Sequence, residues 1–109
     1  MNLLREYIRE LMTEGQTKVY RAMPLSANSV RTGDYVTMSR KFAQDHAMTS
    51  SVYNEEPFQV IMMRVPSETV VDANNPGEYL YTGPEVSRLI KLDIATEEGD
   101  IVSPRRYSK

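Results

Sequence analysis

The first residues of the chain follow the spacing of an amphipathic helix, with charged residues between apolar ones. The apolar positions recur three and four residues apart and are Leu3, Leu4, Tyr7, Ile8, Leu11 and Met12. Gly15 stands where a glycine commonly ends a helix. We therefore predict a helix over residues 1–14. Its apolar side would pack on the rest of the domain or, alternatively, serve as a self-association or docking surface.

Short apolar runs predict strands along most of the remaining sequence. The runs span residues 18–23, 34–38, 58–65, 78–81 and 86–94. The run at 58–65 is the most apolar and is typical of a central strand. Residues 70–71 are either a short strand or part of a turn, and a dense cluster of turn-forming residues follows at 72–77.

A second helix is predicted directly after the second strand. From Ser39 the apolar period changes, and Phe42, Ala43, His46 and Ala47 share one face of a short helix over residues 40–48. The order helix, strand, strand, helix and then a run of strands lacks alternating βαβ units. It favours an α+β domain over residues 17–95, followed by a loose, polar and basic tail at 96–109.

Composition narrows the classes of protein that fit. The chain has 109 residues, enough for one domain, and a formal net charge of -2, so no strong overall field attracts nucleic acid. It has no cysteine, which excludes disulfides and thiolate metal sites and fits a cytoplasmic setting. No run is long and apolar enough for a membrane helix, and charges interrupt the N-terminal apolar pattern as no signal peptide allows. We expect no membrane partner.

Three polar groups stand within or beside predicted strands and carry the candidate chemistry. Arg21 lies among apolar neighbours and suits a phosphate or pyrophosphate, or else pairs with a carboxylate such as Asp34 or Glu78. The hydroxyls of Thr37 and Ser39, two residues apart, could bind a ribose; alternatively Ser39 only caps the helix.

Glu78 opens a strand after the turn cluster. A carboxylate fixed there could bind a sugar hydroxyl and stabilise the positive charge that develops when a glycosidic bond breaks. The plainer alternative is a surface glutamate at the start of a strand. Together, the three groups would suit binding of a dinucleotide and cleavage of its glycosidic bond.

Other chemistry-bearing residues are interpreted as structural. His46 is the only histidine, and without cysteine or a second histidine we expect no metal site; we interpret His46 as a packing or surface residue. Asp72, Asn74 and Asn75 are read as turn formers, because no glutamate follows at the spacing of a calcium loop. The basic residues of the tail are interpreted as solvated.

The ordered segments resemble the arginine-serine-glutamate class of ADP-ribosyltransferase domains. The likeness rests on Tyr20-Arg21-Ala22, on Thr37-Met38-Ser39 leading into a helix, on the strand 58–66 with its Val-Pro end, and on Glu78-Tyr79-Leu80. The stretch 33–37 is similar to small versions of this domain in bacteriophage genomes, and the likeness covers residues 17–94. It implies a compact ADP-ribosyltransferase-like split sheet, mixed or antiparallel, and a phage-encoded protein of the host cytoplasm or the virion.

The resemblance implies NAD as co-substrate and a role for each matching residue. Arg21, beside Ala22, would contact the NAD phosphates or the adjoining ribose, Thr37 and Ser39 would support the nicotinamide ribose, and Glu78 would bind its 2′-hydroxyl. Tyr35 or Phe58 would stack on nicotinamide. The acceptor would be a host protein, nucleic acid or small molecule.

One departure from the family bears on the acceptor. Arginine-modifying members carry a glutamate two residues before the catalytic one, and this chain has Pro76 there, which argues against arginine. The alternatives are a catalytically inactive relative that acts as a binding, virion-associated or host-inhibitor protein, an interaction domain unrelated to NAD, and a ribose-handling enzyme of another reaction type.

Overall fold

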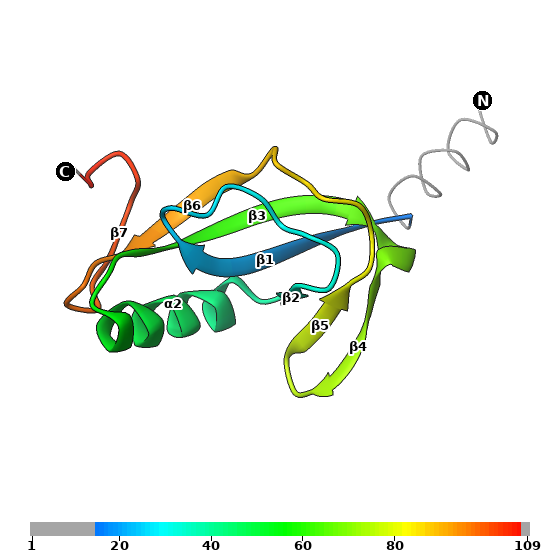
Figure 1. The fold of residues 1–109 in the computed structure, drawn as a ribbon, viewed down its shortest axis with the longest axis horizontal. Helices are drawn as coiled ribbons and strands as arrows, with labels where there is room; N and C mark the ends of the chain where they lie inside the picture. Colours follow the sequence, from blue (N-terminus) through cyan, green and yellow to red (C-terminus); the bar gives the residue numbers. More distant parts are fainter. Residues whose placement is uncertain (1–14, 108–109) are drawn as a thin grey trace, which may run out of the picture.

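The computed structural model describes residues 15–107 as strands packed with one α-helix (Figure 1). The strands are β1 (Gln16–Pro24), β2 (Tyr35–Val36), β3 (Phe58–Pro66), β4 (Val70–Asn75), β5 (Glu78–Tyr81), β6 (Ile90–Ala95) and β7 (Ile101–Val102). The helix is α2 (Arg40–Asn54), and a short 3-10 turn, η1 (Ser67–Thr69), links β3 to β4.

The strands form two antiparallel sheets. The larger has the order β1-β3-β6-β7 and the smaller the order β2-β5-β4. Within residues 15–107 a single backbone bridge joins them, in which Tyr20 of β1 and Thr37 exchange N–H···O bonds of 2.7 and 2.9 Å. Figure 1 shows α2 along one side of the larger sheet, with β2 between the helix and the β4–β5 hairpin.

Each face of the larger sheet has its own apolar core. On the helix side, Ala43 and Ala47 of α2 pack with Phe58 and Val60 of β3. The other core joins the two sheets, and its buried members are Val19, Met23, Val30, Val36, Ile61, Met63, Val65 and Tyr81. Strand β3 contributes to both cores, which is why its apolar run is nearly continuous.

A buried carboxylate fastens the start of α2 to β6. Asp93, whose side chain is 8% exposed, accepts two hydrogen bonds of 3.0 Å from the guanidinium of Arg40 and one of 3.1 Å from Gln44. Hydrogen bonding to Asp93 raises the pKa of Arg40 above its ordinary value, although partial burial of the guanidinium opposes the rise. The charge of Asp93 is thus satisfied from two successive turns of the helix.

The prediction of an α+β domain, with a split sheet that is mixed or antiparallel, is wrong as a description of the fold class. The described residues form mostly antiparallel strands around a single α-helix, and no parallel pair occurs among residues 15–107. Part of the expected helical content was assigned to residues 1–14, which lie outside the described residues. The local periodicity of apolar residues indicates a strand but not the strand it pairs with. The sequence therefore left the direction of pairing open.

The bounds of several elements also differ from the predictions. The helix continues past the predicted residues 40–48 to Asn54, because Ser51 is buried on the same face as Ala47. Its C-cap is Glu55, whose φ of 54° is left-handed. Strand β7 lies inside the stretch expected to be a tail, where it pairs with β6. Within residues 15–107, no helix has the length and apolar character needed to cross a membrane.

Candidate functional site

A pocket of about 310 Å³ lies where the two sheets and α2 meet. Its lining residues are Tyr20, Arg21, Ala22, Pro24, Tyr35, Val36, Thr37, Phe42, Ala43, His46, Phe58 and Glu78. Every residue that the sequence assigned to NAD or to catalysis is in this lining, apart from Ser39.

Strand register explains how distant segments meet in the pocket. Strands β2 and β5 are antiparallel with Val36 opposite Tyr79, so the same register continued by one residue brings Thr37 beside Glu78. On its other side, Thr37 is bridged to Tyr20, the neighbour of Arg21. The arginine, the threonine and the glutamate are thereby aligned across three adjacent segments.

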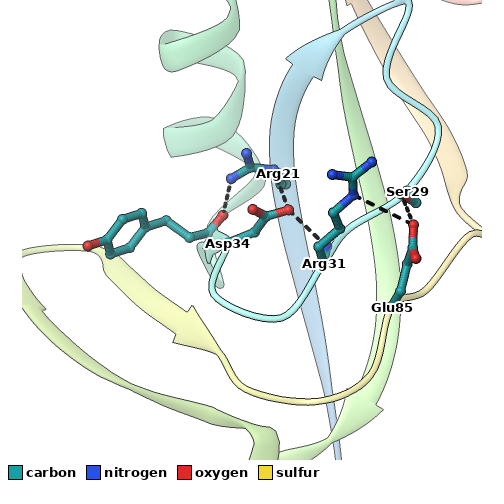
Figure 2. A network of polar contacts seen from close by, with 6 residues as sticks. Arg21, Ser29, Arg31, Asp34 and Glu85 are labelled. Atoms are coloured by element: carbon teal, nitrogen blue, oxygen red, sulfur yellow. Dashed lines mark hydrogen bonds and ion pairs between the residues drawn. The ribbon is translucent and has the colours of Figure 1, made fainter.

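The Arg21 side chain is held in place by two groups of the β2 segment. Its Nη1 donates a hydrogen bond of 2.6 Å to the Tyr35 carbonyl, and its Nε lies 3.9 Å from an Asp34 carboxylate oxygen (Figure 2). The pairing with Asp34 is one of the alternatives that the sequence left open. The third guanidinium nitrogen, Nη2, has no hydrogen-bond partner among residues 15–107, so it is available to an anion.

Asp34 is in turn fixed by the loop before it. The same carboxylate oxygen accepts a 2.8 Å hydrogen bond from the Arg31 backbone N–H, and Arg31 approaches Glu85, which also accepts from Ser29 (Figure 2). The paired backbone of Val30 and Val86 supports these links between the two long loops. The Arg31 backbone thus anchors the Asp34 carboxylate beside Arg21, whereas the exposed Arg31–Glu85 ion pair contributes little.

The two predicted hydroxyls have different surroundings. Thr37 is buried, at 4% exposure, and its Oγ1 accepts a hydrogen bond from the Ser39 backbone N–H. Ser39 Oγ accepts from the Phe42 N–H at 3.0 Å and so caps α2, the alternative that the sequence left open. The pocket contains Thr37 without Ser39.

Glu78 presents an unengaged carboxylate to the pocket. The side chain is half-buried at the start of β5, and it makes no hydrogen bond or ion pair with the described residues. Such a carboxylate keeps its acceptor capacity for a ligand hydroxyl or for a developing positive charge. Glu78 is therefore the strongest candidate for chemistry in the pocket.

The turn before Glu78 rests on the helix. Gly77 has a φ of 81°, and a Cβ built on it would lie 2.8 Å from Cε2 of Phe42. Both the left-handed backbone and the close ring favour glycine here. Contact with Phe42 therefore sets how closely the β4–β5 hairpin, and Glu78 with it, approaches α2.

Gly77→Ala is expected to lower the free energy of unfolding by about 2 kcal/mol, because it adds strain at positive φ and a clash with the Phe42 ring. Gly33→Ala is the matched control: its φ of 95° is also left-handed, but its Cβ would meet nothing within 4 Å. Urea unfolding measures both variants. Equal losses at the two glycines would show that the ring contact does not position the hairpin.

Six lining residues were not predicted as site residues, and two of them, Phe42 and His46, come from one face of α2. Phe42 and His46 lie one helical turn apart on α2, and both face the pocket. The sequence placed them on one helix face, but nothing in the pattern indicated that this face borders the β1–β5 side of the molecule. The aromatic candidates Tyr35 and Phe58 line the pocket, half-exposed and buried respectively.

The remaining polar clusters lie elsewhere. Asp72, Asn74 and Asn75, which the sequence assigned to a turn, belong to strand β4, and Asp72 accepts a hydrogen bond from the Asn74 backbone N–H. No group of three or more metal-ligating carboxylate, histidine or cysteine side chains occurs within residues 15–107.

Comparisons with protein-family models, curated proteins and solved structures found no match. Support for a function therefore comes from the residues of the pocket.

Proposed function

We propose that the protein is an NAD-dependent mono-ADP-ribosyltransferase, encoded by a phage and acting in the host cytoplasm. The observation that supports this most is that Arg21, Thr37 and Glu78 line one pocket although they come from three separate segments. The phage assignment is supported by the likeness of residues 33–37 to phage versions of the domain.

Each of the three residues has a chemical role in this proposal. Arg21 Nη2 binds a diphosphate oxygen, while Asp34 and the Tyr35 carbonyl keep the guanidinium oriented. Thr37 can still donate its hydroxyl proton to a ribose oxygen, since its Oγ1 is used only as an acceptor. Glu78 accepts the ribose 2′-hydroxyl and stabilises the anomeric carbon as nicotinamide leaves.

The pocket volume limits which part of NAD is enclosed. About 310 Å³ lies at the small end of ligand pockets, which span roughly 300–1,000 Å³. It suits the nicotinamide riboside half, which the aromatic residues Tyr35 and Phe58 would contact, and leaves the adenosine half on the surface. The glycosidic bond that breaks lies in the enclosed half and would then be shielded from water.

The test is incubation of the full chain with NAD labelled in the adenylate half, with and without host lysate. Release of nicotinamide together with label on a lysate component is the expected result. Binding of NAD by calorimetry without any release would favour the inactive alternative. If the protein showed no NAD binding and no nicotinamide release, the proposal would be overturned. An interaction domain unrelated to NAD would then be the remaining reading.

A further inference from the structure

A second pocket adjoins the first along α2. It is lined by Phe42, Asp45, His46, Thr49 and Ser50. Phe42 and His46 line both pockets, so these two side chains form the boundary between them. A group seated in the second pocket would reach the first past the imidazole of His46.

His46 is free to act on such a group. The side chain is exposed, and its ring makes no hydrogen bond or ion pair with residues 15–107. Ala43 and Ala47, which flank it on α2, are buried against the larger sheet and fix the helix beneath it. The imidazole therefore projects from a firmly packed part of the helix, and both of its ring nitrogens are available to a ligand.

The other titratable residues of the first pocket are less suited to receive a proton. They are Tyr20, Arg21, Tyr35 and Glu78. A guanidinium has no basic lone pair, a neutral phenol is a weak base, and Glu78 is occupied by the ribose in the proposed function. Imidazole is the side chain most often used as a general base near neutral pH.

We propose that His46 is the catalytic base for the acceptor, and that the acceptor reacts through a hydroxyl group seated in the second pocket. This inference rests on the proposed function. The bond between the ribose anomeric carbon and nicotinamide breaks, and nicotinamide leaves with the electron pair. The acceptor oxygen then bonds to that carbon, and its proton passes to His46 and on to water.

The chemistry of the second pocket favours a neutral hydroxyl over a cationic acceptor. Its carboxylate, Asp45, already pairs with Lys41 at 2.8 Å, so a guanidinium or ammonium group would have to compete with Lys41 for it. The position two residues before Glu78 is Pro76, which offers no second carboxylate. A hydroxyl needs no counter-ion, but it must lose a proton, which imidazole can accept.

Two reactions separate bond cleavage from acceptor attack. Exchange of labelled nicotinamide into NAD reports cleavage alone, whereas formation of methyl ADP-ribose in buffer containing methanol also requires attack by a hydroxyl. For His46→Ala we expect exchange to persist, methyl ADP-ribose formation to fall about 100-fold, and added imidazole to restore much of the loss. Tyr53→Gln, at a position on α2 that is 86% exposed and outside both pockets, should match the wild type.

Each outcome bears on the inference. Parallel loss of exchange and methanol attack in His46→Ala, without rescue by imidazole, would mean a structural role and overturn it. Unchanged methanol attack would overturn it as well, and preference for agmatine over methanol would overturn the hydroxyl assignment. If the wild type catalyses neither exchange nor nicotinamide release, the proposed function itself has failed.

Discussion

Replacing Glu78 with glutamine is expected to reduce nicotinamide release from NAD about 1,000-fold while changing NAD affinity only slightly. The carboxylate interacts most strongly once positive charge appears on the ribose, so its loss raises the barrier more than it weakens ground-state binding. Glutamine retains a similar shape and an oxygen that can accept the 2′-hydroxyl. The measurements are kcat for nicotinamide release and the NAD dissociation constant from calorimetry.

Glu85→Gln is the matched control, because it makes the same chemical change outside the pocket. Glu85 pairs with Arg31 on the surface, and loss of that ion pair should leave both kcat and affinity near wild type. If Glu78→Gln retained wild-type kcat, Glu78 would not be the catalytic carboxylate. If it lost NAD affinity while kcat stayed at the wild-type value, Glu78 would stabilise the bound ground state and the transition state equally and would not be catalytic.

Replacing Asp93 with alanine is expected to cost about 2 kcal/mol in the free energy of unfolding. Three hydrogen bonds to the Asp93 carboxylate are lost, and two of them come from the charged guanidinium of Arg40. The cost stays below that of breaking a fully buried pair, because the Arg40 side chain is 48% exposed and water can solvate the released guanidinium. Urea unfolding gives the difference, and the melting temperature should fall by roughly 10 °C.

Asp45→Ala provides the comparison on the same helix. Asp45 pairs with Lys41 at the surface, an interaction worth about 0.4 kcal/mol, so Asp45→Ala should lower the free energy of unfolding by no more than that.

A double-mutant cycle between Asp93→Ala and Arg40→Met should give a coupling energy above 1 kcal/mol. A coupling near zero would show that Asp93 stabilises the protein through contacts other than Arg40.

The strands that the sequence predicted well are those whose identity depends on local pattern. The bounds of β5 match the prediction, and β3 extends it by Pro66 alone, because both strands are apolar runs set between turn formers. The second half of α2 was missed because residues 49–54 are poor helix formers. Burial of Ser51 against the sheet overrides that propensity.

The site was predictable only as a set of residues. Arg21, Thr37 and Glu78 could be singled out as polar groups in apolar strands, but the ladder that aligns them depends on pairings between distant segments. For Ser39 the sequence allowed two roles, ribose binding or capping of the helix. In the structure its hydroxyl accepts the hydrogen bond of a helix cap. His46 gave no signal of its own, since its place between two pockets follows from how α2 sits on the sheet.

The backbone bridge between Tyr20 and Thr37 joins the two sheets, and through it ligand binding is linked to stability. The pocket draws its walls from both sheets, with Arg21 on one and Glu78 on the other. A ligand that spans both walls binds only while the sheets stay in register, so its binding free energy adds to the work of separating them. Occupancy of the pocket thus acts as a reversible cross-link, and protection of the Tyr20 and Thr37 amides from hydrogen exchange would rise with ligand concentration.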